Sequence, residues 1–503
     1  MYADVIKYIL LMLCAQTIAR SIHEYNAERA NLLEQEFGLQ VGGKIQLSDK
    51  ENSANDVLMR YKQQEVDESF QNPKYFNFSR HYFTYKNDIE RSKVYQIIRR
   101  MPKGAALHVH SSLMLSAERL LALTYEEHLY ACFANDDLKL HFSVTVPKRP
   151  CPTKWQLLNV LRNNTEDIVS FDESIKKHFT LYSENEKDLN YDINYVWERF
   201  DKVCHTIKDL IAYRPVREKF FYEALKEFYN DRVMYIELRS GLPILYELDG
   251  TVHDLAHMPR IYHRVAKKFK EDYPDFIGIK LIVTMHRAKD ITKIRKSIEI
   301  ARQIKEELPD MFAGFDLVGQ EDMGKPLVEF LPALTEAKDD INFYFHGGET
   351  NWFGSSTDEN LVDAILLGSK RIGHGYALIK HPSLLAAVKA RDIALEVNVI
   401  SNVVLSLVSD VRNHPLASYL ALGMPVVLSS DDPGAWGADP LSHDFYISFV
   451  GIASKRADLR MLKQLVINSI KYSALDGSEK MKAFQQLFRE WDDFIEDINT
   501  NFR

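Results

Sequence analysis

The chain has 503 residues, of which 46% are hydrophobic and 27% charged, and its formal net charge is −8. This composition excludes collagen-like and bulk-disordered proteins. The pI of about 6.1 argues against a nucleic-acid binder, which needs a clustered basic surface. No internal window reaches the roughly 18 uninterrupted apolar residues of a membrane span. At roughly 100–200 residues per domain, the length allows several domains or one large barrel with additions.

The first residues have the pattern of a signal peptide. Lys7 precedes a short apolar core, and small side chains at Thr17 and Ala19 suit the −3 and −1 positions of a cleavage site. We therefore predict a signal peptide over residues 1–19 and a secreted, extracellular protein; a buried N-terminal helix is the alternative. Asn77 and Asn163 each begin an Asn-x-Ser/Thr tripeptide, which is consistent with glycosylation of a secreted chain.

The cysteines also favour secretion. Removal of the leader would take Cys14 with it and leave three cysteines. Cys132 and Cys151 flank a short stretch that contains Pro, Lys and Phe, which suits a local disulfide in an oxidising compartment. Cys204 is then unpaired, and the simplest interpretation is a buried free thiol.

Two patterns divide the rest of the chain. Residues 20–95 are charged and helix-favouring, with apolar side chains such as Leu32, Leu33 and Phe37 at helical spacing, and predict an appended helical region. From residue 104 onward, short apolar runs alternate with longer helical stretches such as 288–308 and 361–368. The runs predict eight strands: 105–110, 233–239, 277–283, 312–319, 341–346, 371–375, 394–399 and 425–430.

Nearly continuous apolar runs are typical of parallel strands that helices cover on both sides. Eight βα units close into a (β/α)8 barrel, which we predict over residues 96–503. A doubly wound sheet is the alternative, but no glycine-rich phosphate-binding sequence follows any predicted strand. The gap between the first and second strands is too long for one crossover. It predicts an insertion over residues 120–184, around the Cys132–Cys151 pair.

Polar residues gather at the C-terminal ends of the predicted strands, where barrel active sites form. They are His108 and His110 at the end of the first strand, His346 at the end of the fifth with Glu349 just after it, His374 at the end of the sixth, and Asp431 and Asp432 just after the eighth. Alternate residues of a strand point to one face, so both imidazoles of the first pair can reach one ion. Each residue alone could be a buried polar side chain or a helix cap. Burying all of them is costly unless a cation or hydrogen-bond network compensates.

Three histidines and an aspartate suit Zn²⁺ with one position left for water. Such a metal lowers the pKa of bound water to about 7. Glu349, His374 and Asp432 then remain for proton transfer and substrate contacts. The pattern indicates hydrolytic metal chemistry, and the H-x-E and P-C-x-x-C signature of the cytidine-type zinc deaminases is absent.

The segments MPKGAALHVH, HGGET, RIGHG, ISN and SSDDP resemble the adenosine deaminase superfamily; they begin at residues 101, 346, 371, 400 and 429. The resemblance is greatest to the secreted branch, the adenosine deaminase-related growth factors, and covers nearly the whole chain. It implies one zinc ion per chain, bound by His108, His110, His346 and Asp431, with Asp431 also part of the catalytic set. Glu349 would protonate the purine ring nitrogen N1.

The same resemblance implies roles for residues around the metal. His374 would orient the attacking water and help to deprotonate it. Asp432 would hydrogen-bond N7 of the purine, and the backbone of Gly319 would meet N3. Trp197 and His286 match family residues on the ribose side.

Three positions depart from the family pattern. Ser111 stands where the family usually has an Asp that holds a ribose hydroxyl, Asp201 replaces a longer Glu, and Gly347 replaces an Ala. The metal and proton-transfer residues remain, whereas nucleoside binding is expected to be weaker. An alternative for Ser111 is that it caps the following helix.

The resemblance therefore predicts a secreted zinc-dependent adenosine deaminase that converts adenosine or 2′-deoxyadenosine to inosine or deoxyinosine and ammonia. The alternative is a catalytically weak or inactive growth factor or binding protein that keeps the scaffold. The family also implies that residues 20–95 form a homodimer interface and that the insertion binds a cell-surface receptor or glycosaminoglycan.

Overall fold

The computed structural model describes residues 21–71, 77–135, 137–184, 189 and 192–502. The predicted signal peptide over residues 1–19 lies outside these residues. Within the described part of the chain, no helix combines the length and the apolar character that crossing a membrane requires. Asn163, one of the two glycosylation candidates, is exposed at the end of a helix.

Eight parallel strands form the centre of the molecule. They are β1 (Gly104–His110), β5 (Val233–Ser240), β6 (Gly278–His286), β7 (Phe312–Val318), β8 (His346–Gly347), β9 (Arg371–His374), β10 (Ala394–Val397) and β11 (Val426–Leu428). They pair as two four-stranded sheets, in the orders β1-β5-β6-β7 and β11-β10-β9-β8. Single parallel bridges join the sheets at both edges, from Val109 to Asp431 and from Phe315 to Phe343. This is the strand order of the predicted (β/α)8 barrel.

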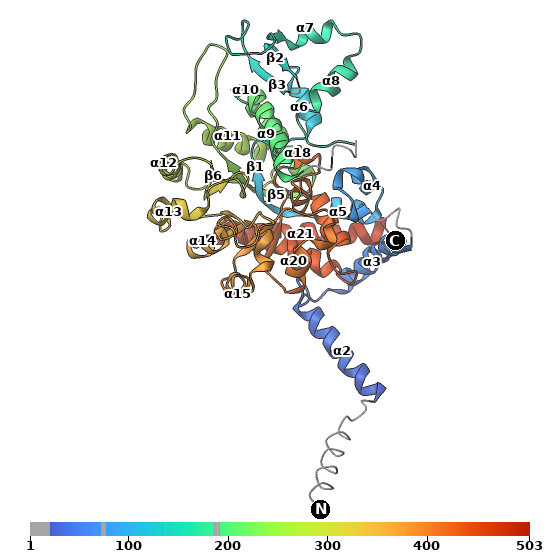
Figure 1. Cartoon of the computed structure of the whole chain (residues 1–503). Helices are drawn as coiled ribbons and strands as arrows, with labels where there is room; N and C mark the ends of the chain where they lie inside the picture. Colours follow the sequence, from blue (N-terminus) through green and yellow to red (C-terminus); the bar gives the residue numbers. More distant parts are fainter. Residues whose placement is uncertain (1–20, 72–76, 136, 185–188, 190–191, 503) are drawn as a thin grey trace, which may run out of the picture.

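The predicted strands are confirmed in position, although their ends differ: β6 continues to His286, β11 covers only Val426–Leu428, and the fifth strand differs most. The fifth run, 341–346, forms a strand only at His346–Gly347, and its earlier part contributes the single bridge at Phe343. Helices follow the strands and lie around the outside of the barrel (Figure 1). Those on the barrel wall are α10 (Arg214–Asn230), α11 (His257–Asp272), α12 (Ile291–Glu307), α13 (Leu331–Ala337), α14 (Asn360–Leu366), α15 (Pro382–Ala390), α17 (Leu416–Ala421) and α20 (Leu459–Lys471).

Helix α12 illustrates why these segments are helical. Asp290 accepts a hydrogen bond from the backbone N–H of Lys293 and so caps the first turn. Ile294, Ile298 and Ala301 recur at helical spacing and are buried, while the opposite face is charged. The apolar face packs on β6 and β7. The helical stretch predicted over 288–308 is therefore confirmed.

Helices precede the barrel, as the charged N-terminal pattern predicts. The first, α2 (Ile22–Leu39), has a capping box at Ser21 and Glu24, buries none of its residues and extends away from the rest of the protein (Figure 1). The next helix, α3 (Asp49–Gln71), packs along α21 (Gly477–Asn501). The short helices α4 (Lys86–Ile89) and α5 (Lys93–Arg100) then lead into β1.

A small antiparallel sheet, in the order β3-β2-β4, lies at one end of the barrel (Figure 1). Its parts and neighbours are α6 (Ala117–Leu123), β2 (Leu129–Ala134), β3 (Asp137–Phe142), β4 (Gln156–Leu157), α7 (Leu158–Asn163) and α8 (Ile168–Lys176). A disulfide joins Cys132 to Cys151, and Cys204 is a buried free thiol, both as predicted. The sheet packs on α9 (Ile193–Leu210), which returns the chain to the barrel.

Replacing Cys132 and Cys151 together by serine is expected to lower the free energy of unfolding by about 3 kcal/mol, the chain-entropy value for a short loop. The two cysteines are 19 residues apart and join β2 to the segment before β4. Because this sheet lies outside the barrel, zinc content and kcat/KM should stay unchanged. Urea unfolding and metal analysis check both statements, and an unchanged free energy of unfolding would contradict the first.

Candidate active site

A cavity of about 380 Å³ opens at the C-terminal ends of the barrel strands. The predicted site residues that line it are His110, Ser111, Trp197, Asp201, His286, Gly319, His346, Glu349, His374, Asp431 and Asp432. His108 is fully buried, with its Nε2 atom 3.4 Å from Asp431 Oδ1. The structure thus brings every predicted metal, catalytic and substrate-contact residue to one place.

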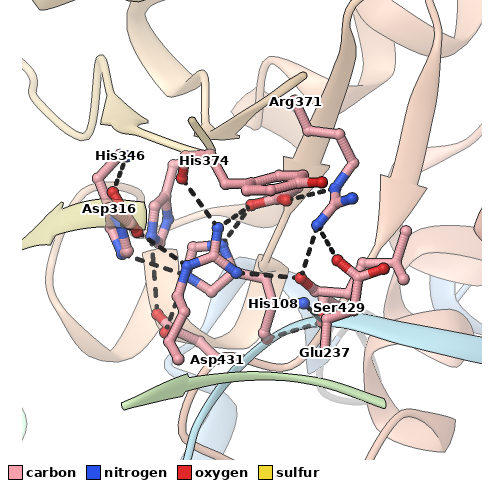
Figure 2. Close-up of polar contacts among 12 residues, drawn as sticks. His108, Glu237, Asp316, His346, Arg371, His374, Ser429 and Asp431 are labelled. Atoms are coloured by element: carbon pink, nitrogen blue, oxygen red, sulfur yellow. Dashed lines mark hydrogen bonds and ion pairs between the residues drawn. The ribbon is translucent and has the colours of Figure 1, made fainter. Parts of the chain in front are cut away.

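Two buried histidines face each other across this site (Figure 2). His108 Nδ1 lies 2.8 Å from Glu396 Oε2, and His346 Nδ1 lies 2.7 Å from Asp316 Oδ2. Carboxylates accept hydrogen bonds, so in the neutral form of each ring the proton lies on Nδ1 and the lone pair on Nε2. The two Nε2 atoms are 3.1 Å apart. Lone pairs that face each other in a buried site repel, and a metal cation removes that repulsion.

Asp431 adds oxygen atoms to this pair. Its Oδ1 atom lies 3.1 Å from His110 Nε2, is buried, and has no hydrogen-bond partner within the described chain. Ser401 Oγ donates to Oδ2 at 2.8 Å. Burial alone raises the pKa of Asp431, but the His108 and His110 imidazoles beside its Oδ1 atom outweigh that effect and hold the pKa well below the usual range. An ionised oxygen is therefore available to a cation.

Candidate ligand atoms form two overlapping groups. Those of His108, His346, His374 and Asp431 lie within 4.8 Å of one another, and so do those of His110, Asp431 and Asp432. Nitrogen and carboxylate donors at this spacing fit the zinc coordination that the sequence predicts. Both His374 and Asp431 have a positive φ, of 59° and 61°, a strained backbone conformation that clusters at functional sites.

A hydrogen-bond relay sets the proton position on His374. The backbone N–H of Leu416 donates to His414 Nδ1, so His414 Nε2 carries a proton and donates to Asn402 Oδ1 at 2.9 Å. The Asn402 amide then donates to His374 Nδ1 at 3.2 Å. Burial holds the pKa of His374 well below its usual value, so the ring is neutral and its proton sits on Nε2. A protonated Nε2 has no lone pair for a metal, which favours His110 over His374 as third nitrogen ligand.

Glu349 is placed as a proton donor. Its Oε1 atom lies 3.6 Å from His374 Nδ1, and burial, with Asp431 and Glu321 nearby, raises its pKa well above the usual value. The Glu321 carboxylate accepts hydrogen bonds from the backbone N–H groups of Gly348 and Glu349, at 3.1 and 2.6 Å, and so holds the segment that carries Glu349 in place. These surroundings therefore favour the protonated, neutral form of Glu349.

Asp432 is a second carboxyl group beside the cavity whose surroundings favour the protonated form. Burial, together with Asp431 and Glu349, raises its pKa well above the usual value. Its Oδ1 atom is buried without a hydrogen-bond partner in the described chain. A neutral carboxyl group in this position can donate a hydrogen bond to a ligand that enters the cavity.

The opposite wall of the cavity comes from α9 and the β6 and β7 ends. Trp197 and Asp201 lie one turn apart on α9 and both line the cavity. Gly319 has a φ of +103°, and a Cβ there would lie 2.4 Å from His286 Nε2. Glycine at this position is therefore what allows the His286 ring to pack against the backbone.

Ser111 lines the cavity and is 2% exposed. Its backbone N–H donates to the carbonyl of Arg239 at 2.9 Å, which extends the pairing of β1 with β5. The next helix, α6, starts only at Ala117, with Ser116 in the N-cap position. The alternative in which Ser111 caps that helix is therefore wrong.

Sequence reasoning missed the groups that hold the metal-site histidines, namely Asp316 and Glu396. Each is fully buried inside a run that otherwise looks apolar. A single carboxylate within an apolar, buried strand could have indicated these groups, because a buried charge needs a buried partner. Asn402 lies in a motif that carried the resemblance, but its relay to His414 depends on the fold.

Known proteins with similar sequences are deaminases. The family model "Adenosine deaminase" matches residues 174–489, and "Adenosine/AMP deaminase N-terminal" matches residues 8–98. Adenosine deaminase 2 of Homo sapiens is 42% identical over 498 residues, covering 98% of this chain and 97% of that protein.

Solved structures support the barrel. An Arabidopsis ADAL complexed with IMP has a TM-score of 0.57 at 17% identity, covering 79% of this chain and 98% of that chain. An amidohydrolase of Burkholderia ambifaria with bound Zn has a TM-score of 0.56 at 18% identity, covering 80% and 94%. At such identities the likeness concerns the fold alone. The sequence matches, by contrast, extend over nearly the whole chain and over the site described above, and the chain belongs to the adenosine deaminase family.

Proposed function

We propose that this protein is a secreted, zinc-dependent adenosine deaminase acting on adenosine or 2′-deoxyadenosine. The observation that carries the proposal is the 3.1 Å separation of the His108 and His346 Nε2 atoms, beside Asp431 and Glu349 at the same cavity. Secretion is supported by the Cys132–Cys151 disulfide, because such bonds persist in oxidising compartments. The leader pattern in the first residues supports it further.

His108, His110, His346 and Asp431 would hold one zinc ion per chain. When bound, zinc lowers the pKa of a coordinated water to about 7 and so supplies hydroxide at neutral pH. His374 would orient the attacking oxygen through its Nε2–H. The relay from Asn402 supports this orienting role more than a role as base, because a neutral ring protonated at Nε2 has no lone pair there.

The remaining groups would act on the purine. Glu349 would donate its proton to N1, which makes C6 more electrophilic as the oxygen adds. Asp432 would donate a hydrogen bond to N7, and the backbone N–H of Gly319 would meet N3. Loss of ammonia from C6 then leaves the 6-oxo purine, inosine or deoxyinosine. Trp197 and His286 would enclose the ribose.

Two further roles follow from surfaces outside the cavity. The unburied helix α2 would form a homodimer interface, since it exposes large apolar side chains. These are Ile22, Tyr25, Leu32, Leu33 and Leu39. The disulfide-bridged insertion around residues 120–184 would carry a growth-factor-like role by binding a cell-surface receptor or a glycosaminoglycan.

A second candidate function is a catalytically weak or inactive binding protein or growth factor that keeps the scaffold, with or without the zinc. Ser111, in place of the family's aspartate, favours it. Following the ultraviolet absorbance of adenosine with purified, zinc-loaded protein separates the two. Turnover supports the deaminase, whereas zinc-loaded protein without turnover supports the second candidate. A chain that binds no zinc contradicts the deaminase.

Replacing Ser111 by aspartate is expected to raise kcat/KM for adenosine by about 5- to 30-fold. A carboxylate accepts a charge-assisted hydrogen bond from a ribose hydroxyl, which contributes about 1.5–3 kcal/mol against about 0.5–1.5 for a neutral bond. The gain should be smaller for a nucleoside that lacks the contacted hydroxyl. Ser112→Asp, beside it on the cavity wall, is the matched control. An unchanged kcat/KM in folded, zinc-loaded S111D would show that this pocket does not hold ribose as expected.

A further inference from the structure

Arg239 lies on β5 inside the barrel, where it is 1% exposed. Its Nε atom lies 2.9 Å from Asp316 Oδ2, and its Nη2 atom lies 2.6 Å from Glu396 Oε2. It also donates to the carbonyl oxygens of Leu107, at 3.0 Å, and Tyr344, at 3.1 Å. One guanidinium group thus contacts the strands β1, β7 and β10 and the segment before β8.

The two carboxylates that Arg239 contacts are those that hold the facing histidines. Glu396 Oε2 accepts from both Arg239 and His108, and Asp316 Oδ2 accepts from both Arg239 and His346. The contacts form an unbroken chain from one imidazole, through carboxylate, guanidinium and carboxylate, to the other imidazole. The two imidazoles at the ends of this chain face each other, with their Nε2 atoms 3.1 Å apart (Figure 2).

The shape of the guanidinium matters for this chain. Its N–H donors point in fixed directions within one plane, so it sets the separation of the two carboxylates that it bridges. Each carboxylate in turn orients one imidazole through Nδ1. A lysine ammonium is a point charge on a flexible stem and cannot hold both carboxylates and both carbonyls in that geometry.

We propose that Arg239 is a positioning residue that sets the spacing and orientation of His108 and His346, so that their Nε2 atoms are preorganised for one metal ion. The inference rests on the zinc site proposed above. It differs from a general stabilising role because it makes the two histidines a single unit, joined through one side chain whose hydrogen bonds go to the carboxylates behind the rings and not to the rings themselves.

Arg371 offers a matched control. It is also 1% exposed and also pairs with two buried carboxylates, Glu396 Oε1 and Glu237 Oε2, each at 2.6 Å. It donates to two backbone carbonyls as well, those of Leu107 and Tyr472. Among the contacts of the described chain, it reaches the carboxylate behind His108 but not Asp316 behind His346. Replacing it should therefore cost similar stability and disturb the site less.

The experiment compares Arg239→Lys with Arg371→Lys in the full chain. Zinc affinity is measured by competition with a chelator, apo-protein stability by thermal unfolding, and ligand geometry by the visible spectrum of the Co²⁺-substituted protein. We expect R239K to bind zinc about 10- to 100-fold more weakly than wild type, the usual effect of removing a group that orients metal ligands. Its cobalt spectrum should change. R371K should show a smaller loss at a comparable drop in Tm, with the wild-type spectrum.

Equal losses of zinc affinity in the two variants, or an unchanged cobalt spectrum in R239K, would overturn the proposal. If R239K does not fold, Asp316→Asn and Glu396→Gln test the same chain with nearly isosteric changes. Their effects on zinc affinity should not add in the double variant, because groups in one network are coupled; additive effects would overturn the proposal. A wild type that binds no zinc contradicts the proposed function itself, whereas zinc-binding wild type with unaffected R239K contradicts only the role of Arg239.

Discussion

Glu349→Gln is expected to lower kcat by about 10²- to 10⁴-fold, the usual contribution of general acid–base catalysis. The amide has nearly the same shape as the carboxyl group but cannot release a proton to N1 of the purine. The backbone N–H of residue 349 would still bond to Glu321, so the turn and the neighbouring histidines should stay in place. Zinc content should therefore equal that of the wild type. Adenosine turnover and metal analysis of the same preparation check both expectations.

Glu359→Gln is the matched control for this change. Glu359 is exposed, lies in the segment that follows the same strand, and is outside the cavity. The control should keep wild-type kcat. If the wild type is active and E349Q keeps more than about a tenth of its rate, far above the loss typical of a missing general acid, Glu349 is not the proton donor.

The double variant His108→Ala, His110→Ala is expected to lose stoichiometric zinc and all turnover. The two imidazoles supply half of the four proposed ligands, and four-ligand zinc sites have apparent binding free energies of about 10–16 kcal/mol. Removing half of the ligands should raise the Kd for zinc by several orders of magnitude. Metal analysis after dialysis against a chelator measures the loss.

The control for the zinc experiment is His263→Ala, since His263 is an exposed histidine on α11. It should retain one zinc per chain under the same dialysis. If the double variant also retains one zinc, the metal lies elsewhere and the assignment of all four ligands is wrong.

The barrel could be predicted because its strands are buried on both faces and read as short apolar runs. The run 371–375, for example, becomes β9, Arg371–His374. The fifth strand was harder, since pairing beyond His346–Gly347 is set by neighbouring strands rather than by composition. Only one backbone bridge, at Phe343, forms in the earlier part of that run.

The site could be predicted in part for a similar reason. His108, His346, His374 and Asp431 could be predicted as site residues because they lie at or just after the C-terminal ends of strands, which converge in a barrel. The ion pairs inside the barrel could not be predicted, because partners such as Arg239 and Asp316 are distant in sequence. The tautomer of His374 also depends on a relay from another segment. Strand order predicts which residues meet but not which hydrogen bonds they form.

The seam between β1 and the end of β11 has a consequence for folding. The backbone N–H of Asp431 donates to the carbonyl of His108, and that of His110 donates to the carbonyl of Asp431, so the bridges that join this edge are made by the metal-site residues themselves. The backbone N–H of His108 also donates to Ser429 Oγ across this seam, and these two residues are 321 positions apart in the chain. Contacts of such high sequence separation form late, because the chain must lose the entropy of closing a long loop before any contact compensates for that loss. The nascent chain therefore cannot bring the four proposed zinc ligands together until β11 has been made and has docked, so full metal binding is expected only after that step.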